Sequence, residues 1–266
     1  MKQVFFYALM TMLIISLGSC NKNEDENNPA PIPEAPILVS EITVTTDMPN
    51  KPAKEVLAFT YDDSYRVKQV KWLNNETLDF KYGKSTIDLK VTYSSTPSDK
   101  SDYHFTVENN HVISLEVAYK NVDSKTNYQI EYTPDDYLAQ ITYMHMDRTI
   151  VRKPIWKDSN LIDFEEKGVK YRYYRPSEYL NKSNIDLSVV VSGYISYIDL
   201  SYAALIKQLG KPSKNIMENV PNSLHDYQYN YVADDNGYVQ SITKKITDKN
   251  TDKVYTITYS VKYLNK

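Results

Sequence analysis

Apolar and polar residues alternate at every second position through most of this chain after Ile37. Between Thr86 and Tyr93, for example, Ile, Leu, Val and Tyr stand at alternate positions, with Asp, Lys and Thr between them. This period places the apolar side chains of an extended segment on one face and the polar side chains on the other. Such two-faced strands are typical of antiparallel sheets, because parallel strands are usually buried on both faces. The pattern therefore predicts a mainly β protein.

The alternating segments are joined by short stretches of turn residues, such as Asn109-Asn110 and Asp234 to Gly237. These residue types favour tight turns, so neighbouring segments are expected to pair as hairpins. About a dozen strands result, and a sheet of this length has to curl or close. The expected fold is a strongly curved antiparallel meander sheet, an open or partly closed barrel, in a single domain at residues 37–266. Alternation is clearest at residues 78–82, 87–93, 103–107, 113–119, 128–132, 169–173, 227–231 and 255–263.

One segment has the helical period instead. From Asp199 to Leu209, apolar residues recur at three and four positions apart. Asp199 or Ser201 can cap its N-terminus, and Gly210 and Pro212 end it. The sequence predicts one short α-helix at about residues 199–209, packed on the concave side of the sheet.

A degenerate repeat accompanies the turns. An acidic or amide residue is followed by one apolar residue and, about three positions later, by another. The turn side chain can bind backbone amides, and the first apolar residue covers the strand entrance. The segment from Tyr61 to Val67 is similar to the Tyr-Asp (YD/RHS) repeat, in which glycine stands where this chain has Tyr65. The apolar pairs are Val67 with Val70, Val112 with Leu115, Leu138 with Ile141, Leu161 with Phe164, and Val239 with Ile242.

The first 19 residues fit a secretory signal peptide: Lys2 gives a basic start, and the apolar stretch from Val4 to Ile15 is shorter than the roughly 20 residues that span a bilayer. The four residues that end at Cys20 resemble the lipobox of bacterial lipoproteins. That resemblance implies that Cys20, the single cysteine of the chain, is the lipidation site and that the chain is attached to a membrane through acyl chains. An ordinary secretory signal beside an unmodified cysteine is the alternative.

Residues 20–36 are predicted to form a disordered acidic and proline-rich tether. Glu24 to Glu26 resemble the acidic export signal of lipoproteins from Bacteroidetes-type bacteria. This resemblance implies an outer-membrane lipoprotein and favours the cell surface over the periplasmic face. A plain hydrated linker would have the same composition.

Taken together, the chain's features resemble those of uncharacterised Bacteroidetes lipoproteins of the DUF4595-type family. These features are the lipobox, the acidic tether, the turn-and-strand units, the helix that begins near Ile198 and the tyrosine-rich last hairpin. The resemblance covers about residues 55–264. It implies a porin-like or half-barrel β fold and an outer-membrane setting. The family has no established catalytic residues to carry over.

Composition narrows the classes of partner. The net charge is −3, and this argues against nucleic-acid binding, which usually requires a basic surplus. The chain has 25 Tyr but 6 Phe, and such residues suit half-hydrated sheet faces or a ligand groove. If the fold gathered its two tryptophans with nearby tyrosines on one open face, it could stack on a glycan. These speculative ligand-binding residues are Trp72, Trp156, Tyr171, Tyr173 and Tyr174, and the alternative is that both tryptophans belong to the core.

Catalytic and metal-binding motifs are not apparent in the sequence. The four histidines do not have metal-ligand spacing, and neither a nucleophile elbow nor a phosphate-binding glycine loop is present. We expect no catalytic residue, no metal and no cofactor. The first hypothesis is a non-enzymatic lipoprotein that binds a glycan, lipid or protein; the second is an accessory subunit of an outer-membrane complex; the third is a hydrolase with two convergent carboxylates.

Overall fold

The computed structural model describes most of the chain after the predicted tether. Residues 1–35, which include the predicted signal peptide, Cys20 and most of the tether, lie outside the described residues, so those assignments stay predictions. No helix in the described part of the chain has the length and apolar character needed to cross a bilayer. The described residues are 36–49, 51–72, 76–93, 100–119, 125–145, 148–172, 174–193 and 198–264.

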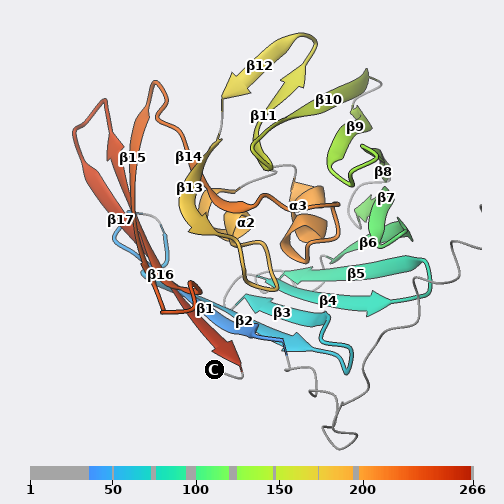
Figure 1. The fold of residues 1–266 in the computed structure, drawn as a ribbon, viewed down its shortest axis with the longest axis horizontal. Coiled ribbons are helices and arrows are strands. Elements are labelled where there is room, and N and C mark those ends of the chain that lie inside the picture. The colour runs from blue at the N-terminus through green and yellow to red at the C-terminus, as the bar shows by residue number, and fades with distance from the viewer. Residues whose placement is uncertain are drawn as a thin grey trace, which may run out of the picture. The chain divides into compact units, whose positions relative to one another are not determined.

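Most of the described chain forms one antiparallel sheet of 15 strands, as the alternation predicts (Figure 1). Across the sheet, the strands run in descending order from β12 to β1 and continue with β17, β16 and β15. The first strand therefore pairs with both the second and the last. The sheet is curved and not closed, since β12 and β15 end it without pairing with each other. Its strands are β1 Leu38–Thr46, β2 Lys54–Tyr61, β3 Val67–Trp72, β4 Glu76–Tyr82, β5 Thr86–Tyr93, β6 Lys100–Glu108, β7 His111–Tyr119, β8 Lys125–Tyr132, β9 Leu138–His145, β10 Arg148–Lys157, β11 Asn160–Glu166, β12 Val169–Arg172, β15 His225–Ala233, β16 Val239–Asp248 and β17 Val254–Leu264.

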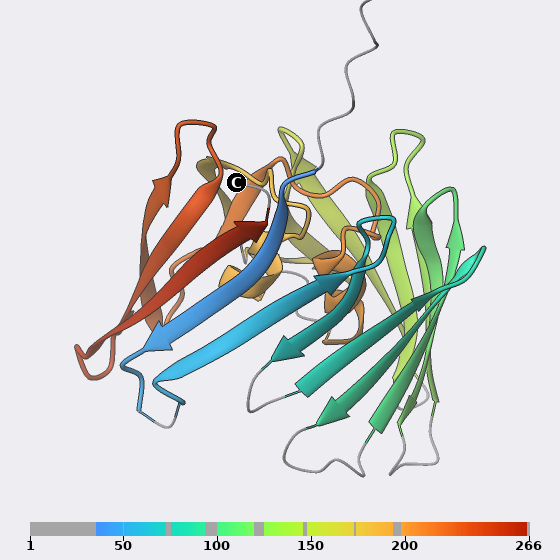
Figure 2. The same cartoon turned by 90° about the horizontal axis from the view of Figure 1, so that it is seen from below.

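Two helices, α2 (Leu187–Ser192) and α3 (Ile198–Leu205), lie on the concave side of the sheet (Figures 1 and 2). Buried residues of both helices belong to the same hydrophobic core as the inward-facing strand residues. Ring packing joins the layers, since Tyr202 of α3 meets Tyr103 of β6 edge-on at 5.3 Å between centroids. The helices thus cover the apolar face that the curved sheet cannot cover by itself.

The predicted helix is confirmed but ends earlier than expected. The chain leaves α3 after Leu205, because Lys207 adopts a left-handed conformation (φ 56°) and its amide donates to the carbonyl oxygen of Ala204. Helix α2 was not predicted. Three consecutive valines give its sequence the appearance of a strand, yet Asp186 caps its N-terminus by accepting from the Ser188 amide at 2.9 Å, and Gly193 ends it at φ 64°.

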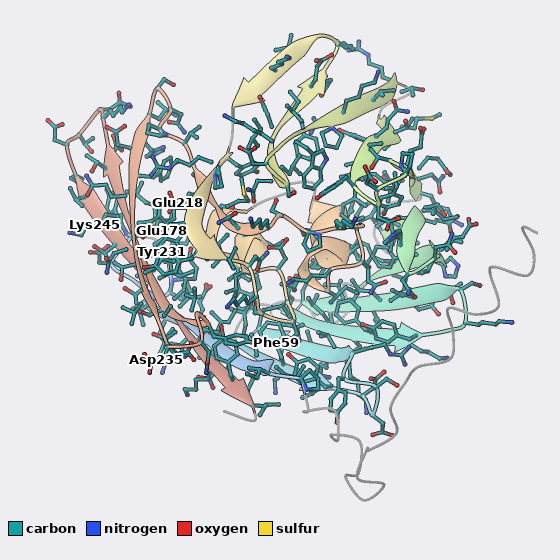
Figure 3. All side chains as sticks on the ribbon, in the orientation of Figure 1. Phe59, Glu178, Glu218, Tyr231, Asp235 and Lys245 are labelled. Atoms are coloured by element: carbon teal, nitrogen blue, oxygen red, sulfur yellow. The ribbon has the colours of Figure 1, made fainter. Side chains whose placement is uncertain are left out.

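A second, two-stranded sheet, β13 (Tyr174–Leu180) and β14 (Asn215–Asn219), connects to both ends of the large sheet by side-chain hydrogen bonds. The backbone amide of Asn215 donates a hydrogen bond to Oδ1 of Asn160 on β11 at 2.8 Å, and Nδ2 of Asn160 donates one to Oδ1 of Asn215 at 3.2 Å. At the other end, the hydroxyl of Tyr229 on β15 donates to Asn219 Oδ1 at 2.8 Å and accepts from the Asn219 amide at 3.1 Å. Figure 3 shows the neighbouring Tyr231 inside the curve and Lys245 outside it.

Aromatic side chains at strand ends donate to the backbone of the preceding strand. Among the described residues, five such bonds link β1–β2, β3–β4, β7–β8, β9–β10 and β16–β17. The acceptor in four of them is the carbonyl of the first apolar residue of the repeat noted above, which is buried in each copy. A phenylalanine could not make this bond, and this explains part of the excess of tyrosine. The bonds are Tyr61 to Val39 (2.5 Å), Tyr82 to Val67 (3.0 Å), Tyr132 to Val112 (2.6 Å), Trp156 to Leu138 (2.8 Å) and Tyr263 to Val239 (2.8 Å).

We expect Tyr132→Phe to lower the free energy of unfolding by about 1 kcal/mol, because the Val112 carbonyl loses its donor while the packing of the ring is kept. Urea unfolding followed by tryptophan fluorescence measures this change. The control is Tyr65→Phe, at a half-exposed ring, which should change stability by less than about 0.5 kcal/mol. Equal losses in the two variants would contradict a specific role for the strand-end hydroxyls.

Candidate functional site

A cavity of about 560 Å³ lies between the concave face of the sheet and the two helices. Strands β1 to β4 and β17 form one wall, and α2 and α3 form the other. Cavities that bind small organic ligands usually measure roughly 300–1,000 Å³ and combine apolar walls with a few polar groups. This cavity has that character. Its lining residues include Val44, Leu57, Val70, Leu78, Leu205 and Ile257 among the apolar ones and Glu55, Trp72, Glu76, Tyr202 and Tyr259 among the others.

In the sheet wall of the cavity, Trp72 on β3 lies between two strands that each contribute a glutamate, β2 with Glu55 and β4 with Glu76. Trp72 on β3 stands opposite Leu57 on β2, so the two side chains share the concave face. The indole Nε1 of Trp72 donates to Glu55 Oε2 at 3.1 Å. Glu55 is two positions from Leu57 and therefore points to the same side of β2. One carboxylate of the cavity is thus engaged by the protein.

The second carboxylate, Glu76, is held differently. It begins β4, is buried with 8% of its surface exposed, and lines the cavity. The hydroxyl of Tyr202 lies 3.4 Å from each of its two oxygens, longer than the usual 2.5–3.0 Å of an O–H···O bond. Burial raises the pKa of Glu76 above its ordinary value, and the Tyr202 hydroxyl counteracts this in part. The arrangement leaves Glu76 room for a stronger partner.

Beside the cavity, Asp199 at the start of α3 accepts two tyrosine hydroxyls. Tyr128 and Tyr119 donate to its Oδ2 at 2.7 and 2.9 Å. Burial, followed by the Asp199 charge, raises the pKa of Tyr119 to about 12, so this tyrosine stays a hydrogen-bond donor at neutral pH. These bonds fix the N-terminus of α3, and with it Tyr202, over the sheet wall.

Lys244 on β16 is a buried cation on the same concave face. It stands opposite Ile257 of β17, which lines the cavity. Its Nζ donates to Asn219 Oδ1 at 2.6 Å and to the Val191 carbonyl at 3.3 Å, and it lies 5.1 Å from the centroid of the Tyr227 ring. Burial lowers the pKa of Lys244 to about 8. The lysine therefore attaches α2 and β14 to the sheet at a cost in stability.

The structure separates the residues predicted to bind a ligand. Trp72 lines the cavity from β3, whereas Trp156 is on β10, with six strands between them in the described sheet. The ring of Trp156 packs against that of Tyr137 at 4.8 Å between centroids. Both tryptophans are half-buried against the core. Tyr174 is buried at the start of β13. The side chain of Tyr171 and all of Tyr173 lie outside the described residues, so their role stays a prediction.

Sequence reasoning missed Glu76, Tyr202 and Lys244. A signal for two of them is present in the alternation: Glu76 continues the register of Leu78, and Lys244 shares that of Ile242. A charged residue in the apolar register of a strand has to be buried or to line a cavity, because its face is covered. The position of Tyr202 depends on how α3 packs, which the sequence pattern does not specify.

No protein-family model matches the chain, and no curated protein matches it either. Membership of the DUF4595-type family therefore stays a prediction. Among solved structures, the chain is similar to a porin-like protein from Bacteroides uniformis, with a TM-score of 0.59 and 15% identity. The match covers 85% of this chain and 98% of that protein. At this identity the likeness is one of fold.

The buried cation gives a prediction about stability. We expect Lys244→Met to raise the free energy of unfolding at pH 7 by about 1–3 kcal/mol, because the desolvated charge is removed and both of its acceptors keep a tyrosine donor nearby. Because the pKa in the folded state lies below the unfolded value of 10.5, the unfolded chain binds more protons above pH 8. Wild-type stability should therefore rise with pH between about 8 and 9.5 relative to that of the variant.

Lys245→Met, at the exposed neighbouring position, is the matched control and should leave stability and its pH dependence nearly unchanged. Urea titrations at several pH values test both variants. A Lys244→Met protein that is less stable than the wild type at pH 7 would contradict the prediction and make the lysine a net stabilising contact.

Proposed function

We propose that this chain is a non-enzymatic lipoprotein of a bacterial outer membrane that binds a small amphipathic molecule in the cavity between sheet and helices. The cavity carries the proposal: its lining surface is mostly apolar, and one of its polar groups, Glu55, is held by the Trp72 indole. A ligand with a large apolar part fits such walls better than a glycan, which needs many hydrogen-bond partners. Of the residues expected to bind a ligand, Trp72 lines this cavity, and this supports a part for it in binding.

The lipobox resemblance implies attachment to the membrane through acyl chains on Cys20. The polar character of the convex face of the sheet agrees with an anchor of that kind. Neighbouring strands there place polar and charged side chains beside each other, with Asp79 opposite Lys90 and His104 opposite Glu116. The imidazole Nδ1 of His104 also lies 2.6 Å from Asp88 Oδ1. Strands that face lipid carry an apolar outer band, and charges in that band are costly. The convex face of these strands therefore suits water, and we propose that the acyl chains anchor the protein, with the cell surface favoured. The half-barrel fold also supports placing the chain in the DUF4595-type family.

The hydrolase hypothesis is less well supported. The cavity contains two carboxylates, but Glu55 is bound by the Trp72 indole and the apolar lining offers few groups to orient a sugar. A glycoside hydrolase uses two carboxylates that flank the scissile bond, one as the acid and the other as the base or nucleophile, together with groups that orient the sugar.

A cavity-filling variant tests binding. We expect 3-phenylpropanol, a water-soluble neutral probe, to bind the full chain in lipid nanodiscs saturably, and Leu57→Trp to weaken its affinity at least tenfold because the indole fills the cavity. Calorimetry with empty discs subtracted measures this. Thr60→Trp, on the exposed face of the same strand, is the control and should bind like the wild type. Equal binding by all three proteins would place the ligand elsewhere.

A second function, assembly into an outer-membrane complex, is favoured by one observation. Strand β15 ends the large sheet, and its Val232 is 52% exposed. A sheet edge with unpaired backbone groups is a template for another chain.

If β15 is used in this way, Val232→Lys should shift the chain from a larger complex to the mass of the single protein on native gels of solubilised membranes. A charge at an edge strand opposes pairing with another chain. Thr60→Lys, on an interior strand, should leave the migration unchanged. Migration of the wild type at the single-chain mass would remove the assembly role.

A further inference from the structure

The charges that line the cavity are unbalanced. Its described lining contains the carboxylates of Glu55 and Glu76 but one ammonium, that of Lys51. Lys51 is exposed on the loop between β1 and β2, whereas Glu76 is buried on the wall. The less exposed part of the lining therefore carries the two carboxylates, and aromatic rings line the same cavity.

Glu76 is the residue that a ligand would satisfy. A carboxylate can accept about four hydrogen bonds, and within the described residues Glu76 has the Tyr202 hydroxyl at 3.4 Å from each oxygen. A buried carboxylate without strong donors destabilises a fold. A cation that donates hydrogen bonds would compensate this cost on binding.

The neighbouring groups favour a cation over a neutral donor. Trp72, Tyr202 and Tyr259 line the same cavity, and the faces of such rings attract organic cations. The apolar walls require the remainder of the ligand to be hydrophobic. An anionic amphiphile would meet two carboxylates.

We propose that the cavity selects amphipathic ligands with a positively charged amine, and that Glu76 is the counter-ion. This inference rests on the proposed function, since it names the ligand class of the same cavity. It assigns the space beside Glu76 to the ammonium group and the apolar side chains of β1, β3 and β17 to the apolar part of the ligand.

The test uses three probes of one size: 3-phenylpropylamine, 3-phenylpropanol and 3-phenylpropanoate. With the full chain in nanodiscs of neutral phospholipid, we expect the amine to bind at least tenfold more tightly than the alcohol, and the carboxylate to bind most weakly. Glu76→Gln should remove the preference for the amine while keeping the affinity for the alcohol. Asp79→Asn removes one charge from the outer face of the same strand and should keep the preference.

The outcomes separate this inference from the function it rests on. If the alcohol binds and Leu57→Trp blocks it, but the amine has no advantage or keeps it in Glu76→Gln, the cavity binds ligands and the charge selection is wrong. If none of the three probes binds, both proposals are wrong. Thermal unfolding of Glu76→Gln checks its fold: the variant should be at least as stable as the wild type, because it loses a buried charge.

Discussion

Burial of the concave apolar face is the interaction on which the rest of the structure depends. A sheet of 15 strands with one apolar face is stable in water only if that face is covered. Here α2, α3 and the β13–β14 pair cover it. The cover is attached at its margins by polar contacts, such as Asn215 with Asn160 and Lys244 with Asn219. This cover does not fill the space over β1 to β4 completely, and the cavity is the space left between the helices and that part of the concave face.

Tyrosine hydroxyls donate hydrogen bonds to two kinds of acceptor in this structure, backbone carbonyls near strand ends and the carboxylate of Asp199. At strand ends the ring packs inward while the hydroxyl binds a carbonyl of the adjacent strand, as Tyr132 does with Val112. Beneath α3 the hydroxyls of Tyr119 and Tyr128 satisfy Asp199, which would otherwise be a buried charge without donors. Burial raises the pKa values of these phenols above the ordinary value of 10.0, so they remain donors even in alkaline solution. Among the described residues, Asp199 accepts two tyrosine hydroxyls at 2.7 and 2.9 Å, whereas the one tyrosine hydroxyl at Glu76 lies 3.4 Å from each oxygen. This contrast is the basis for proposing Glu76 as the group that meets a ligand.

Local pattern predicted most of the strands, the turns and α3, because these depend on residues close in sequence. The curved meander is confirmed for the same reason: each hairpin is a local event. Other features depend on contacts between distant segments and could not be read from the pattern. Three features are of this kind: β1 lies beside β17, β13 and β14 form a separate sheet, and Trp72 lies far from Trp156. Helix α2 was hidden by its valines, although its Asp186 and Gly193 are ordinary cap residues.

The position of β1 has a consequence for how the chain reaches its native state. Leu38 pairs with Leu264, so the joint between the first strand and the last needs almost the entire domain to be present. Contacts between residues so far apart in sequence form slowly, because a long loop must close first. One side of β1 therefore stays unpaired until β17 has been synthesised and can reach it. A chain cut short before β17 would leave β15 and β16 paired with each other but separated from β1, and the sheet would be in two pieces. Pairing of the last strand, which is eleven residues long, is therefore the step that completes the sheet.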